Sequence, residues 1–195
     1  MSKIFAVAAV VFAAGAASAG IVSTTLVPVD NSAADAQIPG FSTTYDTYDL
    51  VIEVEAGDDW TSTSAEATTT GLFYDDALGG DTAVPAFWPV FPALEFDSYY
   101  LNTEGPAGPL GFAGAVISDP SFKSATWFDT PPNGGDGVFA VARYTVDEGA
   151  DLTIVGAHTT IDGGGTLYTY SVTTVPAPGT LALLGLGGLA IRRRR

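Results

Sequence analysis

Short apolar stretches that alternate with polar residues recur along the middle of the chain. In the clearest of them, residues 48–55, the side chains of Leu50, Ile52 and Val54 point one way and their neighbours point the other. This period of two is typical of a β-strand with one buried face. Turn residues, mostly Gly, Pro, Asp and Asn, separate the stretches. The pattern predicts strands at residues 21–29, 48–55, 68–74, 94–101, 112–117, 122–128, 138–146, 152–157 and 167–172.

An all-β fold follows from this pattern. Eight or nine short strands with turns roughly every 8–15 residues predict an antiparallel β-sandwich of the jelly-roll or Ig-like kind. Residues 32–38 are rich in alanine and fit either a turn of helix or a loop, whereas residues 77–92 predict a long loop with three prolines. Strict alternation along residues 138–146 places Val141 and Ala142 on opposite faces of their strand.

The start of the chain forms a separate apolar segment. Lys3 is basic, residues 4–14 carry no charge, and Ala17-Ser18-Ala19 supplies small residues of the kind that signal peptidase accepts. Residues 1–19 therefore predict a cleavable signal helix that directs the chain into the export machinery, and residues 20–174 predict the mature domain. The alternative is an N-terminal membrane helix that is retained, although the apolar run is short for a span.

The end of the chain, residues 175–195, combines a proline pair, an apolar run and a basic terminus. Its parts are Val175, Pro176, Ala177 and Pro178, the uncharged run 181–191, and Arg192, Arg193, Arg194 and Arg195. As a hydrophobic helix the run spans roughly 17 Å, short of the ~30 Å hydrocarbon core. The arginines would stay at the cytoplasmic face as a stop-transfer signal. The segment therefore predicts a short transmembrane helix that holds the chain at the inner membrane only transiently.

This layout resembles the PEP-CTERM sorting signal of Gram-negative and related bacteria, in which Val-Pro-Glu-Pro precedes an apolar segment and an arginine-rich end. Val175, Pro176 and Pro178 match the motif, whereas Ala177 stands where the family usually has Glu. The resemblance implies that an exosortase-type transpeptidase reads and removes the tail, with residues 173–180 as an exposed spacer. The alternative is a tail anchor that is never processed.

Charge is distributed very unevenly along the chain. All 22 acidic residues fall within residues 20–174, where Lys123 and Arg143 are the only basic ones, which leaves that domain a net charge of −20. So acidic a domain argues against nucleic acid or anionic lipid as partners, since both need clustered Lys and Arg. The chain has no cysteine, so no disulfide stabilises it despite the predicted export.

Little in the domain suggests catalysis. The single histidine, His158, ends a predicted strand, and neither a cysteine nucleophile nor a Gly-x-Ser-x-Gly elbow occurs. We expect His158 to be a surface or half-buried residue and the protein to have no catalytic residues and not to be an enzyme. Glu53 and Glu55 share a strand face, which predicts a solvated surface rather than the acid pair of a glycosidase. A polysaccharide hydrolase remains a weaker alternative.

Zinc-type sites lack His and Cys ligands here, whereas calcium needs only oxygen atoms. Acidic turns usually just solvate a loop, so a bound Ca²⁺ is an open alternative, not an expectation. The acidic turns that offer ligands are Asp58-Asp59, Asp75-Asp76, Asp129 with Asp136, and Asp147-Glu148 with Asp151.

Aromatic residues offer a different kind of site, because flat rings stack on sugar faces and also fill sandwich cores. The candidates are Trp60, Trp88, Trp127, Tyr99 and Tyr100. Trp127 lies in a predicted strand and is expected in the core, whereas Trp88 lies in a proline-rich loop and is expected to be exposed. A possible glycan platform therefore consists of Trp88, Trp60 and Tyr99.

Residues 137–146 loosely resemble a strand of cohesin-like extracellular β-sandwiches, which favours a sandwich fold and implies no binding function. Together the two terminal signals predict an exported bacterial protein at the cell surface or in the extracellular matrix, where we expect a structural or adhesive role in the envelope or biofilm. The alternative is a carbohydrate-binding module for extracellular polysaccharide. Predicted partners are signal peptidase, the exosortase-type enzyme and extracellular polysaccharide.

Overall fold

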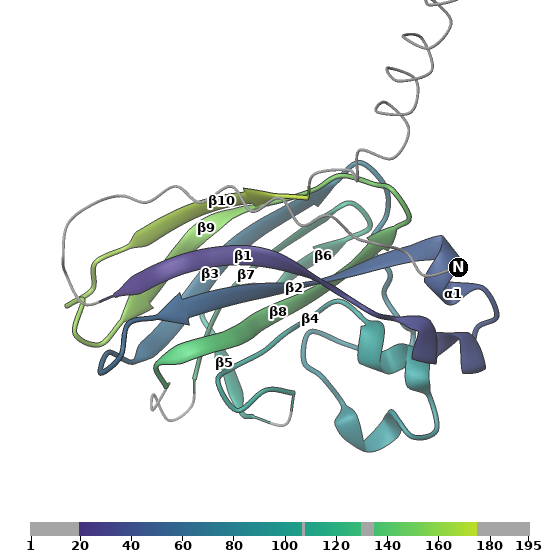
Figure 1. Ribbon diagram of the computed structural model, residues 1–195, viewed down its shortest axis with the longest axis horizontal. Helices are drawn as coiled ribbons and strands as arrows, with labels where there is room; N and C mark the ends of the chain where they lie inside the picture. The colour runs from purple at the N-terminus through teal and green to yellow at the C-terminus, as the bar shows by residue number, and fades with distance from the viewer. Residues whose placement is uncertain (1–19, 107, 130–134, 175–195) are drawn as a thin grey trace, which may run out of the picture.

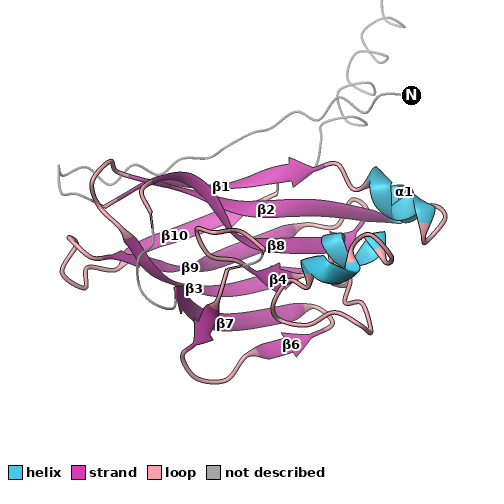
Figure 2. Cartoon of the chain, turned by 90° about the horizontal axis from the view of Figure 1, so that it is seen from below, coloured by secondary structure: helices cyan, strands magenta, loops and turns pink. Residues whose placement is uncertain are grey.

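Two antiparallel sheets pack face to face in the computed structural model, which describes residues 20–106, 108–129 and 135–174 (Figures 1 and 2). The first sheet, in spatial order, consists of β1 (Ile21–Val29), β2 (Tyr45–Val54), β8 (Gly137–Asp147) and β4 (Tyr99–Tyr100). The second consists of β10 (Tyr168–Thr173), β9 (Leu152–Thr160), β3 (Trp60–Thr69), β7 (Phe122–Asp129) and β5 (Leu110–Phe112), with β6 (Ile117–Asp119) also on β7. The predicted antiparallel β-sandwich is confirmed.

The inward faces of the two sheets form the main core. Leu50, Ile52 and Val54 of β2 are buried, as their alternation predicts, and Trp127 of β7 is fully buried among them. Burial of each such side chain contributes about 1.5–3 kcal/mol to the free energy of unfolding. The core is therefore assembled from residues of every long strand rather than from one dominant element.

A second, smaller core lies at one end of the first sheet, on its outer face. Short helices cover this end (Figure 2): η1 (Ser32–Ala36), α1 (Phe41–Thr44), η2 (Pro85–Phe87) and η3 (Pro92–Phe96). Ala34, Phe41, Ala93 and Phe96 are buried together there. Beneath them Thr145 is buried, although its neighbour Tyr144 belongs to the main core, so both faces of β8 are covered at this end.

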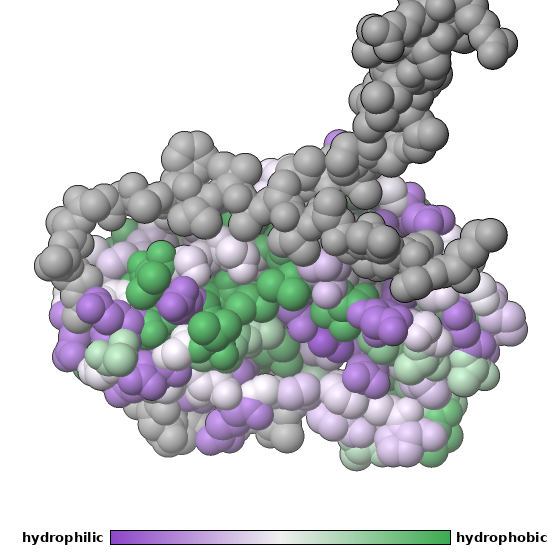
Figure 3. Space-filling view, viewed as in Figure 1, coloured by the Kyte–Doolittle hydropathy of each residue, from purple (hydrophilic) through white to green (hydrophobic). Residues whose placement is uncertain are grey.

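The rest of that outer face is open and partly apolar. Figure 3 shows apolar side chains gathered over the middle of the sheet in the view of Figure 1. Val51 and Ala140 are cross-strand partners there, and Val27 and Val138 are exposed.

Three of the predicted strands differ from the observed ones. Of the strand predicted at 68–74, only Thr68 and Thr69 belong to a strand, β3, which begins already at Trp60. Its inward residues include small or polar ones such as Thr63, Ala65 and Ala67, so its apolar signal is weak. The strand predicted at 94–101 begins inside η3, because Pro92 starts a 3-10 turn that ends at Phe96, and only Tyr99–Tyr100 pair as β4.

Residues 112–117 do not form one strand: Phe112 ends β5, Ile117 begins β6, and Gly114 in the connection between them has a φ of 87°. Strict alternation along β8 is also wrong. Leu50 pairs with Ala142 and Val51 with Ala140, so Val141 is an extra residue in a β-bulge. As a result Val141 and Ala142 are both buried.

The last described residue, Thr174, is buried and fixed to β9. Its N–H donates to the carbonyl of Leu152 at 2.8 Å, and its Oγ1 accepts from the N–H of Leu152 at 2.8 Å. The expectation of an exposed spacer is therefore wrong for Thr174, and residues 175–180 lie outside the described part of the chain.

The predicted signal helix at 1–19 and the short hydrophobic helix of the tail both lie outside the described residues. Within 20–106, 108–129 and 135–174, no helix is long and apolar enough to cross a membrane.

Candidate functional site

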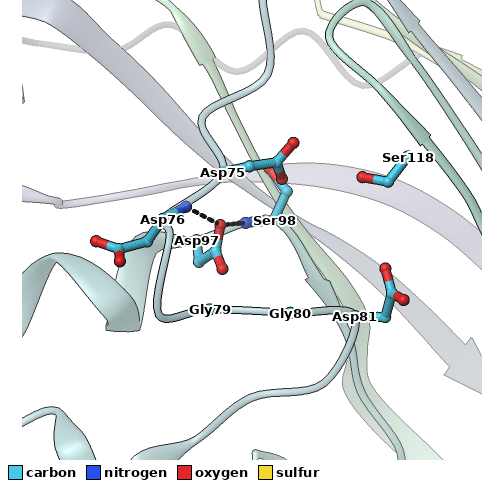
Figure 4. Close-up of a pocket in the computed structure, with 8 residues that line it drawn as sticks. All are labelled: Asp75, Asp76, Gly79, Gly80, Asp81, Asp97, Ser98 and Ser118. Atoms are coloured by element: carbon cyan, nitrogen blue, oxygen red, sulfur yellow. Dashed lines mark hydrogen bonds between the residues drawn. The ribbon is translucent and has the colours of Figure 1, made fainter.

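An acidic hollow of about 250 Å³ lies where the loop after β3 meets the segment between η3 and β4 (Figure 4). Loop residues from 75 to 81, the Asp97-Ser98 pair and the edge strand β6 form its wall. The residues that line it are Asp75, Asp76, Gly79, Gly80, Asp81, Asp97, Ser98 and Ser118. The long-loop prediction for residues 77–92 is confirmed in outline, since only η2 and Pro92, the first residue of η3, are helical there.

Asp97 is the most unusual acid in this hollow, because its side chain is only 2% exposed. Its Oδ1 accepts hydrogen bonds from the N–H groups of Asp76, at 3.0 Å, and Ser98, at 2.9 Å. Burial raises the pKa of Asp97 to about 7, although the two N–H groups lower it; the charge of Asp75 adds to the rise. A carboxyl group that titrates near neutrality in a hollow is a candidate functional group.

The other oxygen of Asp97 occupies the space beside Gly79. A Cβ added at Gly79 would lie 1.7 Å from Oδ2 of Asp97, so the loop can approach the carboxylate only because residue 79 lacks a side chain.

Replacing Gly79 with alanine is expected to displace the Asp97 carboxylate and to lower the free energy of unfolding by about 1–3 kcal/mol. The matched control is Gly80→Ala, because a Cβ at that position meets no atom within 4 Å. Urea denaturation of the two variants measures the difference. Equal stability of both variants would contradict the tight contact between the loop and Asp97.

Lys123 supplies the positive charge of the hollow from beneath, although it is almost fully buried. Its Nζ donates to Oδ1 of Asp75 at 2.6 Å and to Oγ of Ser118, and it lies 5.5 Å from the centre of the Phe73 ring. Lys123 of β7 thereby joins the loop after β3, through Asp75, to the edge strand β6, through Ser118.

The acidic turns proposed as calcium ligands hold the backbone in place. Oδ1 of Asp58 accepts from the N–H groups of Asp59 and Asp162, and Oδ2 of Asp136 accepts from the N–H of Gly57. Oδ2 of Asp147 likewise accepts from Leu72. Across the described ranges, no three His, Asp or Glu residues are grouped so that they could hold a metal ion.

The proposed glycan platform is not assembled. Trp60 and Tyr99 are buried, so neither presents a ring face to a ligand. Trp88 is half-buried and lies against Tyr99 with the ring centres 6.5 Å apart. The expectation was wrong for Trp60 and Tyr99 because both belong to strands whose faces are covered, the latter by the helical layer. Trp127 is in the core, as predicted.

The burial of three chemically interesting residues was overlooked or misjudged when only the sequence was considered. His158 is fully buried, not half-exposed, because β9 is covered on that face by β1. Asp97 was overlooked, since nothing in its neighbourhood marks it as buried. The burial of Lys123 could have been predicted, because Lys123 lies on the same face of its strand as the buried Ala125 and Trp127.

Comparison with known proteins bears on the tail rather than on the hollow. Residues 174–195 match the model of the PEP-CTERM protein-sorting motif. No curated protein matches the chain. The match begins at Thr174, the residue that ends the described domain, so the motif follows the β-sandwich directly. The chain thus carries a PEP-CTERM motif, which makes it an exported protein, sorted by an exosortase to the cell envelope or surface.

Proposed function

We propose that the mature domain has a structural or adhesive role in the envelope or extracellular matrix and catalyses no reaction. The observation that carries the proposal is the junction between domain and motif. The sorting motif follows a β-sandwich whose last residue, Thr174, is hydrogen-bonded to β9. A folded body placed immediately before a sorting signal is suited to display at the surface.

The charge of the domain supports the same proposal. Its net charge of −20 keeps neighbouring copies apart and soluble, and disfavours binding to anionic lipid or nucleic acid. Many of its carboxylates accept hydrogen bonds from backbone N–H groups of turns, as Asp58 and Asp147 do. The acids therefore serve the solubility and the turn geometry of a presented domain.

Intact-mass analysis of the protein from its native host tests the sorting step. We expect a mass that lacks residues 1–19 and the residues after about Pro178. A Pro176→Ala/Pro178→Ala variant should instead keep its tail, because it lacks the prolines of the motif. A wild-type mass that ends at Arg195 would contradict processing by an exosortase, and one that begins at Met1 would contradict cleavage by signal peptidase.

The role after sorting needs a separate measurement. Deleting residues 175–195 should release the domain into the medium and remove it from the envelope fraction, with the fold unchanged by circular dichroism. This release should weaken the matrix; if the domain is released and the matrix nevertheless stays intact, the structural role is wrong.

A carbohydrate-binding module for extracellular polysaccharide is the second candidate. It rests on the η2 loop, where Phe87 is 53% exposed beside the half-buried Trp88. A glycan array probed with wild type and with Trp88→Ala and Phe87→Ala distinguishes the two roles. Binding that both substitutions abolish would establish the module, whereas absence of signal on every glycan would exclude it.

A further inference from the structure

A chain of four hydrogen-bonded side chains crosses from one sheet to the other near the edge of the sandwich. Thr24 of β1 lies 3.1 Å from Nε2 of His158, and Nδ1 of His158 lies 2.8 Å from Oγ1 of Thr63. Nε1 of Trp60 donates to that same Oγ1 at 3.0 Å. Thr24 belongs to the first sheet and the other three belong to β9 and β3 of the second. We call these four residues the latch.

The polarity of the latch can be assigned from its donors. Oγ1 of Thr63 already accepts from Trp60, and its own hydroxyl hydrogen has His158 Nδ1 as its acceptor in this arrangement. His158 then carries its proton on Nε2 and donates it to Oγ1 of Thr24. With the imidazole neutral, both ring nitrogens of His158, Oγ1 of Thr63 and Nε1 of Trp60 have hydrogen-bond partners. A second proton on Nδ1 would leave the Thr63 hydroxyl without an acceptor in a buried position.

The surroundings of His158 offer no charge that would stabilise an imidazolium. The ring is fully buried and stacks on Tyr170 of β10 with the centres 4.3 Å apart. The titratable side chains that face the ring are Tyr170 and Tyr168, and Tyr168 is the cross-strand partner of His158. β3 presents Thr63 and Trp60 to the ring, and β1 presents Thr24. Burial alone lowers the pKa of His158 to about 3.

Of the three strands that carry the latch, β1 can detach at the lowest free-energy cost. It is an edge strand whose only paired strand is β2, and it lies alongside β10 without pairing with it (Figure 1). β9 and β3 are each paired on both sides. Water therefore reaches His158 most easily when β1 detaches from the edge of the first sheet and no longer covers the second.

We propose that the latch is an acid-sensitive device: protonation of His158 detaches β1 both from the second sheet and from its partner strand β2, while the rest of the sandwich stays folded. In the open state His158 regains an ordinary pKa near 6.5, whereas in the closed state it remains neutral to about pH 3. The open state thus binds the extra proton, and the closed state loses stability as the pH falls below about 6.5. The effect is absent at and above neutral pH.

Asp97 acts in the opposite direction and must be separated from the latch. Because its pKa is raised to about 7, the folded state takes up its proton first, and acidification from pH 7 toward 4 strengthens the fold around the hollow. Asp97 lies between η3 and β4, away from β1 in the sheet order, and an Asp97→Asn background removes its contribution.

Hydrogen exchange of the mature domain, read by mass spectrometry at pH 7.5 and 4.5, tests the proposal. After correction for intrinsic rates, opening of residues 21–29 should rise about 100-fold on acidification, while β3 and β7 show no such rise. His158→Asn and His158→Gln should abolish the rise. If β1 and β3 open together, or if the variants keep the full rise, the proposal is overturned.

Nitrogen chemical shifts of His158 in the wild type provide a second test that needs no variant. We expect the Nε2–H form throughout, with a titration midpoint below 4. A midpoint near 6.5 in the folded domain would overturn the proposal by itself.

Discussion

Replacing Trp127 with alanine is expected to lower the free energy of unfolding by about 3–5 kcal/mol. The side chain is fully buried between the sheets, and its ring centre lies 4.5 Å from that of Tyr100. Its Nε1 donates to the carbonyl of Leu101 at 3.0 Å, so the substitution also leaves that carbonyl without its donor. Chemical denaturation followed by circular dichroism measures the loss.

Two variants serve as controls for this prediction. Trp127→Phe keeps most of the volume and removes the hydrogen bond, so its cost should be clearly smaller, about 1–2 kcal/mol. Phe87→Ala removes a half-exposed ring and should change the free energy of unfolding by about 0.5 kcal/mol or less. If Phe87→Ala costs as much as Trp127→Ala, the main core is not where we place it.

The core position of Trp127 was predictable because β7 alternates cleanly. The same holds for β2, where Leu50, Ile52 and Val54 are the inward residues. Buried and less buried residues alternate along residues 50–54 of β2 and along all of β7, and the large apolar side chains of both strands point inward, although Lys123 and Asp129 of β7 are buried as well. A local pattern suffices when burial on one face is the only demand on the strand.

The local hydropathy pattern did not predict two other strands correctly, for two different physical reasons. β3 is built largely from Ser, Thr and Ala, so that its membership of the sheet depends on pairing with β7 and β9 rather than on its own hydropathy. In β8 the bulge at Val141 changes the parity halfway along the strand. A bulge is set by the register of two paired strands, which one strand's sequence does not encode.

The hollow was less predictable than the strands, because its residues come from distant parts of the chain. Lys123 and Asp75 are separated by 48 positions and meet only when the loop after β3 packs against β7. Asp97 is buried by the same loop, through its contact with Gly79. The acidic pair Asp75-Asp76 was noticed in sequence, but its lysine partner requires the tertiary fold.

A long-range ion pair also lies beneath the helical layer at the end of the first sheet. Arg143 of β8 donates from Nε to Oδ1 of Asp49 at 2.7 Å and from Nη2 to Oδ2 at 2.9 Å. Its Nη1 donates to the carbonyl of Glu95 in η3 at 2.9 Å, and its guanidinium lies 5.8 Å from the centre of the Phe96 ring. Burial by itself lowers the pKa of Arg143, but the hydrogen bonds and charge of Asp49 hold it above its ordinary value. Arg143 therefore joins the sheet to the layer above it.

Replacing Asp49 with alanine is expected to cost about 3 kcal/mol or more, because it leaves the guanidinium of Arg143 buried without its carboxylate. The side chains of Arg143 and Asp49 are only 13% and 17% exposed, so water compensates little. The loss should be measured by urea denaturation at low and high salt, and it should change little with salt because the pair is shielded from solvent. Glu66→Ala removes the same charge from an exposed position of β3 and should be nearly neutral.

The double variant Asp49→Leu/Arg143→Met shows whether the cost belongs to the unpaired charge. If it does, replacing both partners with apolar side chains recovers most of the stability that Asp49→Ala loses. Arg143→Lys, in contrast, should recover little, because a lysine cannot donate to both oxygens of Asp49 and to the carbonyl of Glu95 in the same geometry. A double variant as unstable as Asp49→Ala would instead mean that the helical layer depends on the shape of the pair, so that its removal destabilises the layer whatever its charge.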